Sequence, residues 1–215
     1  MNNHVMGSAP LSRRTTLQLL ATGTAALALP GARALAASPA APTSAAPLLD
    51  SVAWNLIGHA PENATTLGVD TGAHAALRSQ LEDRSFAGRA ALADTLRSDL
   101  VKVQAFNPSH LSHAERTSLA VIRSAYKTSL DGLALPYGDV AVGGWRNTPY
   151  VVIQNVGAYL DTPKFLDADH QVKSAEDAEA YVARLSQFDS QLDGELERMR
   201  AATDGRLLCR VNGWG

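Results

Sequence analysis

With 215 residues, the chain is long enough for one sizeable domain or two small ones, and an apolar share of 46% is sufficient for a hydrophobic core. A formal net charge of -2, without a cluster of Lys and Arg, gives no electrostatic basis for nucleic acid or anionic lipid as a partner. The single cysteine, Cys209, excludes an intramolecular disulfide and a thiolate zinc cage.

The first 36 residues have the features of an export signal. Adjacent Arg13 and Arg14 precede an apolar run over residues 17–29, and small residues end the segment at Ala36. Paired arginines are typical of the twin-arginine type, and the run is shorter than the roughly 20 residues that span a bilayer. We therefore predict a signal peptide over residues 1–36, rather than a retained anchor, and a periplasmic protein without membrane attachment after cleavage. Residues 37–47, all Ala, Ser, Pro and Thr, predict a linker.

Five segments between residues 48 and 131 predict helices. Apolar residues recur in them at spacings of three and four, which is the period of one helix face. Ser85 is a candidate N-cap, and Ser112 with Glu115 has the spacing of a capping box. Because Asn107-Pro108 separates the last two segments, they predict a two-helix hairpin. The predicted helices cover residues 48–57, 61–68, 74–81, 85–105 and 112–131.

Two further helices are predicted near the end of the chain, after a turn at residues 160–166. The first begins at Ser174 and should bury the face made of Ala178, Tyr181, Val182, Leu185 and Phe188. The second covers residues 190–202, and we expect its apolar side chains to point inward and its charged ones to remain in solvent. The apolar set is Leu192, Leu196 and Met199, and the charged set is Glu195, Glu197, Arg198 and Arg200.

The stretch over residues 134–159 differs in composition from the Ala-rich sequences of the predicted helices around it. It contains three tyrosines, Trp145, Gly143-Gly144 and two prolines. Paired glycines and Pro149 oppose a long helix, while several valines favour extended backbone. The sequence therefore predicts a mainly α fold, an irregular helical array with a short β-hairpin or extended loop near residues 137–154.

Within this stretch, Trp145, Arg146 and Tyr150 are the candidate substrate-binding residues. The guanidinium of Arg146 offers a planar fork to a carboxylate, and the aromatic rings offer amphipathic walls. The competing interpretation is a buried structural loop, in which the aromatic rings fill the core and Arg146 pairs with Asp139 or a helix C-terminus.

Motifs that would specify catalysis are absent from the printed sequence. It contains no His-Glu-x-x-His, no Gly-x-Ser-x-Gly and no P-loop. His59 and His74 are isolated, and His110 and His113 straddle a predicted helix cap, where helical geometry does not hold. We therefore predict no catalytic, cofactor-binding or metal-binding residue on this chain.

The residues from Leu135 to Tyr150 read Leu-Pro-Tyr-Gly-Asp-Val-Ala-Val-Gly-Gly-Trp-Arg-Asn-Thr-Pro-Tyr. Together with Pro61-Glu62-x-Ala-Thr-x-Leu-Gly68 and the run 177–185, this text resembles the bacterial proteins grouped as domain of unknown function 885 (DUF885). The resemblance covers residues 48–205, whereas residues 206–215 form an atypical, truncated tail.

The resemblance implies a larger protein of zinc metallopeptidase type. Members look like longer helical proteins whose C-terminal half carries a zinc-binding His-Glu-x-x-His, so zinc is expected only for a full-length relative, with a peptide as its substrate. We accordingly expect this chain to be an exported N-terminal portion, catalytically incomplete alone. Two alternatives stay open, namely a stand-alone periplasmic binding or interaction module and a non-functional truncation product.

Overall fold

Three serine side chains begin helices where the sequence predicts them. The hydroxyl of Ser85 accepts a hydrogen bond from the amide of Gly88, and Ser112 and Ser174 do the same within full capping boxes. These caps satisfy amides that lack a partner inside the helix, and the residues involved lie within three positions of each other. Their local nature explains why the helix starts can be predicted from the sequence.

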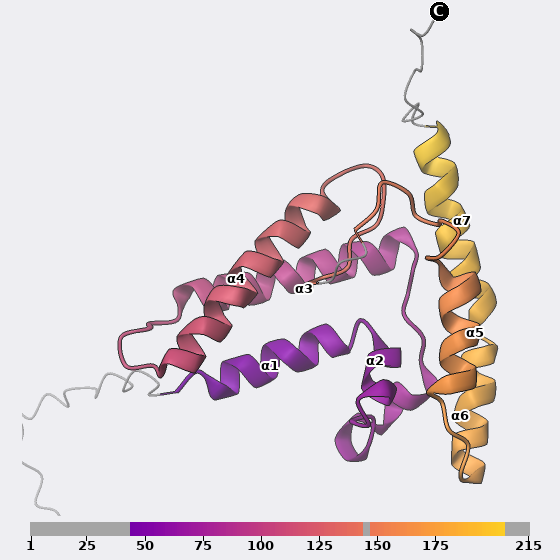
Figure 1. Ribbon diagram of the computed structural model, residues 1–215, viewed down its shortest axis with the longest axis horizontal. Helices are drawn as coiled ribbons and strands as arrows, with labels where there is room; N and C mark the ends of the chain where they lie inside the picture. The colour runs from indigo at the N-terminus through magenta and orange to yellow at the C-terminus, as the bar shows by residue number, and fades with distance from the viewer. Residues whose placement is uncertain (1–43, 144–146, 205–215) are drawn as a thin grey trace, which may run out of the picture. The chain divides into compact units, whose positions relative to one another are not determined.

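The computed structural model describes residues 44–143 and 147–204, which lie within a compact unit over residues 41–215. The predicted mainly α fold is confirmed, and this part of the chain contains no strand. None of its helices is both long enough and apolar enough to cross a membrane. The helices are α1 (Ala46–Ile57), α2 (Pro61–Thr66), the 3₁₀ helix η1 (Gly72–Ser79), α3 (Phe86–Ala105), α4 (His113–Leu133), α5 (Ala158–Ala168), α6 (Ala175–Leu185) and α7 (Phe188–Asp204) (Figure 1).

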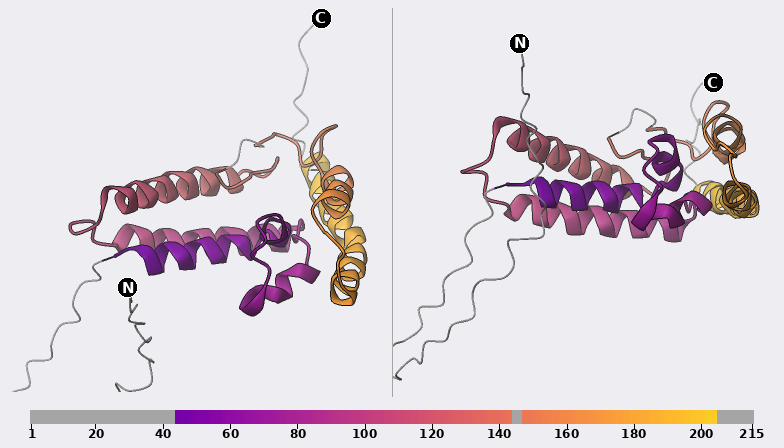
Figure 2. Two further views of the ribbon diagram at one scale, coloured as in Figure 1. Left: turned by 60° about the horizontal axis from the view of Figure 1, so that its bottom comes forward. Right: turned by 90° about the horizontal axis from the view of Figure 1, so that it is seen from below.

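Helices α1, α3 and α4 run alongside one another and share an apolar core (Figure 2). The predicted hairpin of α3 and α4 is confirmed, because the two helices bury Leu96, Val103, Leu119 and Tyr126 against each other. Val52 of α1 joins this cluster. Burying such side chains stabilises the fold by roughly 1.5–3 kcal/mol each.

The contacts among α2, η1, α5, α6 and α7 are more polar. Only Leu81, Phe165 and Leu166 form a buried apolar cluster there. Arg184 of α6 is fully buried and donates hydrogen bonds to the carbonyls of Gln80 and Leu77 and to the hydroxyl of Thr65. A buried charge needs such partners, so this side chain joins α6 to α2 and η1.

The predicted inward face of α7 is wrong. That of α6 is confirmed only in part, since Tyr181 and Phe188 pack against the buried cluster of Leu81, Phe165 and Leu166. Val182 and Leu185 are more than half exposed, while Ala180 and Arg184 are buried. On α7, Gln191, Glu195 and Arg198 are buried, and Leu192, Leu196 and Met199 are 36–42% exposed. The physical reason is that the inward side of α7 faces loop carbonyls and the first-turn amide of α5, which have no partner within regular structure and require polar ones. Glu195, for example, accepts hydrogen bonds from the amide of Ala158, at 2.9 and 3.0 Å.

The turn predicted at residues 160–166 is also wrong, since the structure has α5 there with Pro163 in its interior. An interior proline removes one helical hydrogen bond and ordinarily breaks a helix. Packing outweighs that cost here, because Phe165 and Leu166 are buried and the hydroxyl of Thr162 donates to Gln191 at 2.6 Å. The helix expected over residues 74–81 is also corrected, because the structure has the 3₁₀ helix η1 over Gly72–Ser79, two residues earlier.

The stretch between α4 and α5 is an extended loop. Of the two expected forms, a short β-hairpin or an extended loop, the structure has the loop. It carries two isolated antiparallel bridges, which pair Asp139 with Thr148 and Ile153 with Val156. Gly138 has a φ of +79°, and a Cβ there would lie 2.4 Å from the carbonyl oxygen of Thr148. Only glycine fits this position, so the first bridge depends on it.

Candidate functional site

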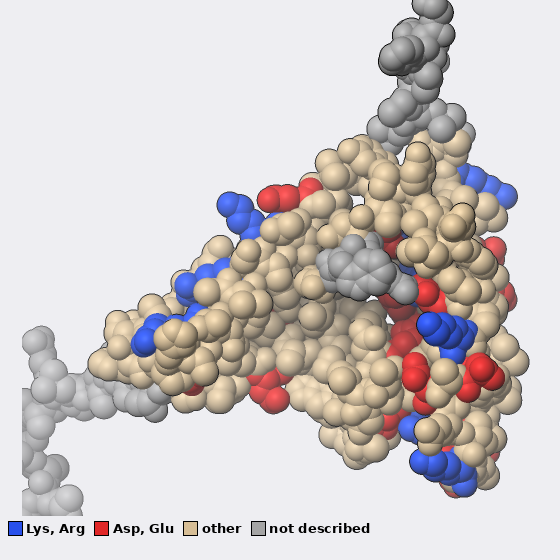
Figure 3. Space-filling model, viewed as in Figure 1, with Lys and Arg blue, Asp and Glu red and all other residues tan. Residues whose placement is uncertain are grey.

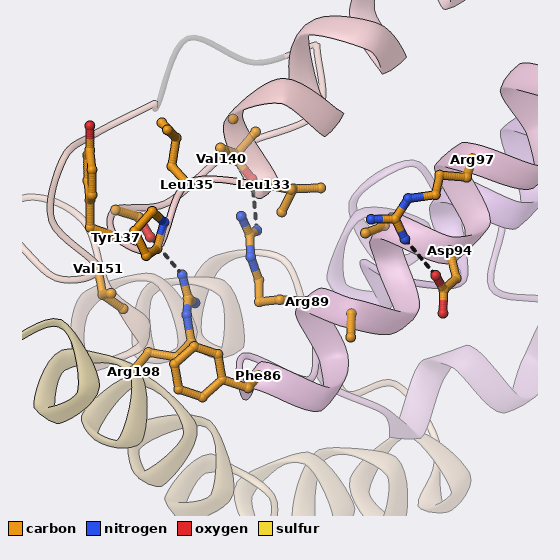
Figure 4. A pocket seen from close by; sticks show the side chains of 15 residues that line it. Phe86, Arg89, Asp94, Arg97, Leu133, Leu135, Tyr137, Val140, Val151 and Arg198 are labelled. Atoms are coloured by element: carbon orange, nitrogen blue, oxygen red, sulfur yellow. Dashed lines mark hydrogen bonds and ion pairs between the residues drawn. The ribbon is translucent and has the colours of Figure 1, made fainter. Parts of the chain in front are cut away.

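A cavity of about 310 Å³ lies where this loop meets the helices, and we call it the central pocket (Figure 4). The first turns of α3, the end of α4, the loop and one residue of α7 form its walls. Ligand sites are commonly concave and apolar with a few convergent polar groups, and the central pocket has this composition. Its lining consists of Phe86, Arg89, Ala90, Ala93, Asp94, Arg97, Gly132, Leu133, Leu135, Pro136, Tyr137, Gly138, Val140, Val151 and Arg198.

Two arginines from different helices hold the loop at this pocket. Nη1 of Arg89 donates to the carbonyl of Val140 at 2.9 Å and lies 3.1 Å from Oδ1 of Asp139. Nη2 of Arg198 donates to the same carboxylate oxygen at 2.9 Å and to the carbonyl of Gly138 at 3.1 Å. Figure 4 shows both side chains reaching from their helices toward the loop. The side chain of Arg198 is only 6% exposed, so this contact is largely shielded from water.

The charges around Asp139 are therefore unequal. One carboxylate faces two guanidiniums, and the third arginine of the pocket, Arg97, is occupied by Asp94 at 2.7 Å on the exposed rim. Burial lowers the pKa of Arg89, and the charge of Asp139 opposes this effect. The nearby charge of Arg198 lowers the pKa further, and that of Glu82 raises it. Arginine stays protonated even so, and the pocket retains a positive interior.

Apolar side chains form the rim of the pocket. Phe86 is 48% exposed, Leu135 50% and Tyr137 40%, whereas Val151 is buried behind them. Exposed apolar side chains gathered around a cavity are typical of a binding site. The rim can take an apolar group, and the interior can take a negative charge.

A second cavity, of about 510 Å³, lies between α4 and the same loop. Small polar residues of α4, among them Ser124, Thr128 and Ser129, form one wall, and Asn147 and Thr148 of the loop form another. It shares Gly132, Leu135, Tyr137 and Val140 with the central pocket. The loop is thus accessible from two sides.

Of the three residues that the sequence selects, only Tyr150 lies within the described residues, and it does not line the central pocket. Trp145 and Arg146 lie outside the described residues. Tyr150 is 63% exposed and is absent from the lining of both cavities, while its backbone bonds to the hydroxyl of Thr148. The tyrosines of the stretch do not fill the core, because Tyr137 and Tyr159 are also exposed.

Sequence reasoning missed Arg89 and Arg198. The only signal was Asp139, the one acid in residues 134–159, which needed a cationic partner and has only Arg146 within that stretch. Arg89 and Arg198 lie 50 and 59 positions from Asp139, each on a helix with other charges, so nothing in the sequence selected them.

Acidic side chains gather beside α5 in the view of Figure 3, and a separate cavity there is lined by Glu62, Glu82, Asp161 and Asp169. Burial raises the pKa of Glu82 to about 7, against the lowering effect of Arg84, and the charge of Glu62 adds to the rise. Although 34% of the Glu82 side chain is accessible, surrounding protein replaces much of its water. The carboxylates of Glu62 and Glu195 are occupied by backbone amides, which indicates a structural role.

The four histidines considered in the sequence have separate surroundings. His59 bonds to the hydroxyl of Thr95 at 2.8 Å, and His74 stacks on Trp54 with ring centroids 3.4 Å apart. His110 is exposed in the connection before α4, and His113 is exposed at the start of that helix. Among residues 44–143 and 147–204, no group of three or more His, Cys, Asp or Glu could hold a metal ion.

Comparison with known proteins gives one family. A family model described as "Bacterial protein of unknown function (DUF885)" matches residues 61–211, most of the chain. This match confirms the resemblance to the DUF885 family that the sequence motifs indicate. The bounds differ, since the motifs place the resemblance over residues 48–205. No curated protein matches the chain.

Proposed function

Because the chain belongs to the DUF885 family, we propose that it is an exported protein related to zinc metallopeptidases, whose helical part binds peptide without hydrolysing it. The observation that carries this proposal is the central pocket, which combines an apolar rim with the buried guanidinium of Arg198 and the partly buried one of Arg89. A peptide offers both groups that such a pocket takes, namely apolar side chains and backbone carbonyl or carboxylate oxygens.

The described residues do not fit the zinc ion that the resemblance implies. A zinc site needs three or four His, Cys, Asp or Glu ligands, and the described ranges contain no such group. The printed sequence contains no His-Glu-x-x-His either. We derive no hydrolytic step from this chain and assign it the role of binding and positioning.

Peptide binding can be measured by fluorescence anisotropy with dansyl-labelled apolar tetrapeptides and the full chain. We expect saturable binding that Phe86→Ala weakens by about tenfold, because the variant removes an aromatic wall of the pocket. Val121→Ala is the matched control, since Val121 is an exposed apolar residue of α4 that is not part of the pocket. Binding that is unaffected by Phe86→Ala would contradict the proposal, as would zinc-dependent peptide hydrolysis that a chelator abolishes.

Export is supported by the paired arginines and the short apolar run that follows them. Replacing both, as Arg13→Lys with Arg14→Lys, should leave the protein in the cytoplasmic fraction of a bacterial host. The matched control is Arg33→Lys, which changes an arginine outside the pair. Equal amounts of both variants in the periplasmic fraction would contradict the twin-arginine route.

A second candidate function is that of an interaction module, and the apolar side of α7 favours it. Leu192, Leu196 and Met199 recur at helical spacing and are 36–42% exposed. Sedimentation of the full chain over a range of concentrations tests this candidate. Association that Leu196→Gln abolishes would favour it, whereas a monomer at every concentration would argue against self-association. A cooperative thermal transition in the same samples would argue against the third possibility, a non-functional product.

A further inference from the structure

The guanidinium of Arg89 has an edge that no group of the described protein occupies. Both contacts of this guanidinium with the described residues use Nη1, which binds Val140 and Asp139. Guanidinium carries five N–H donors, and no hydrogen bond from Nε or Nη2 of Arg89 is present among residues 44–143 and 147–204. Those two atoms form the side-on edge that binds a carboxylate through two parallel hydrogen bonds.

The charges of the pocket favour an anion at this edge. Three guanidiniums, those of Arg89, Arg97 and Arg198, face the carboxylates of Asp94 and Asp139. The charge of Glu82 also acts on Arg89, but burial raises the pKa of Glu82 to about 7, so this group is only partly ionised near neutral pH. A net positive charge therefore remains in a cavity partly shielded from water. A carboxylate bound there would balance the pocket, since charge-assisted hydrogen bonds gain strength when water is excluded.

The apolar rim lies next to that charge. Phe86 precedes Arg89 by three positions on α3, so the two side chains share one face of the helix. Figure 4 shows Leu135 near the guanidinium of Arg89, and Tyr137 lies farther along the loop on the same pocket. A ligand that occupies the pocket must carry an apolar group close to a single negative charge. The residue at the free end of a peptide has this arrangement, because its side chain and its α-carboxylate leave the same carbon atom.

We infer that the central pocket binds the C-terminal residue of a peptide, with the terminal carboxylate on the Nε and Nη2 edge of Arg89 and an apolar side chain among Phe86, Leu135 and Tyr137. The inference rests on the proposed peptide-binding function and narrows it to free C-termini. An internal peptide segment would leave the extra positive charge unbalanced, and a basic C-terminal residue would be repelled by it.

The test compares two dansyl-labelled tetrapeptides that end in Phe, one with a free C-terminal carboxylate and one with a C-terminal amide. We expect the free acid to bind the full chain about tenfold more tightly, because the amide removes the negative charge. Equal affinities would overturn the inference while leaving peptide binding intact. Failure of both peptides to bind would overturn the proposed function itself. A third ligand, 3-phenylpropionate, carries the carboxylate and ring without a peptide bond, and binding as tight as that of the free acid would overturn the assignment to peptides.

Two variants with opposite expected signs locate the carboxylate. Arg89→Gln should remove the preference for the free acid over the amide, and Asp139→Asn should increase it several-fold, because the asparagine keeps a carbonyl for both arginines but no longer competes as an anion. Arg200→Gln is the matched control, since Arg200 is exposed on α7 and is not part of the pocket. If Asp139→Asn left the ratio of affinities unchanged in a protein that melts cooperatively, the placement on Arg89 would be wrong.

Discussion

Arg184 and His170 form a hydrogen bond inside the protein, with Nη1 of the arginine 2.7 Å from Nδ1 of the histidine. Guanidinium can only donate, so Nδ1 must be the acceptor and the ring proton must sit on Nε2. Nε2 lies 3.0 Å from the backbone carbonyl of Asp177, to which it donates. The buried ring is therefore neutral and held in one tautomer.

This pair predicts a loss of stability in mild acid. Burial lowers the pKa of His170, and the charges of Arg184 and Arg78 lower it further, against the backbone bond and charge of Asp177. The folded protein thus resists protonation that the unfolded chain accepts near pH 6.5, and its free energy of unfolding should fall as the pH drops through that value. Urea denaturation at pH 7.5 and 5.5 should show a larger loss for the wild type than for His170→Gln. An equal loss in both proteins would contradict the prediction.

Arg184 itself should be among the most sensitive positions. Its guanidinium satisfies the carbonyls of Gln80 and Leu77 and the hydroxyl of Thr65, and burial lowers its own pKa to about 10. Arg184→Ala leaves these acceptors without a donor and opens a cavity, so we expect a loss of about 3 kcal/mol or more in urea denaturation. The comparison is Arg200→Ala on the exposed side of α7, for which we expect a change within about 0.5 kcal/mol.

Glu82 predicts a pH dependence of the opposite sign. Burial raises its pKa to about 7, whereas the unfolded chain releases the same proton near 4.5. The folded state favours the protonated acid, so this group lowers stability progressively as the pH rises from about 4.5 through 7. Glu82→Gln, which is neutral at every pH, should therefore melt at a higher temperature than the wild type at pH 8 and near the same temperature at pH 5. A variant that is less stable than the wild type at pH 8 would show that the ionised carboxylate is needed by Arg84.

The parts of the fold that follow from the sequence are those with local causes. The caps at Ser85, Ser112 and Ser174 involve neighbours three positions away, and the apolar spacing of α3 and α4 leads directly to their shared core. The inward face of α7 has a distant cause. Its periodicity defines two faces, but the choice between them depends on backbone groups at Arg84, Gly138 and Ala158.

The candidate site likewise has one part that the sequence predicts and another that depends on residues far apart in the chain. Composition singled out the loop over residues 134–159, and the central pocket does lie against it. The charged members of that pocket come from α3 and α7, and no local pattern links residues so far apart. Trp145 and Arg146 lie outside the described residues, so their predicted role stays a prediction.

Gly194 offers a test of how closely α7 must approach α3. A Cβ at this position would lie 2.7 Å from the amide nitrogen of Ser85 and 3.0 Å from the carbonyl carbon of Arg84, which are backbone atoms that cannot rotate away. In an unhindered helix, Gly→Ala stabilises by about 1 kcal/mol, because alanine loses less backbone entropy on folding. We expect the opposite sign here, since α7 must shift and strain the contacts of Glu195 and Arg198.

The measurement is urea denaturation of Gly194→Ala, with Ala201→Gly as the comparison. Ala201 is exposed on the same helix, so its replacement measures the difference in helix propensity between Ala and Gly without a steric contribution. Arg198 reaches the loop only while α7 stays close to the start of α3. Gly194→Ala should therefore also reduce the preference for a free C-terminal carboxylate. A Gly194→Ala protein more stable than the wild type would contradict this prediction. It would mean that α7 can accept a methyl group at position 194 and that its polar face does not require close contact with the start of α3.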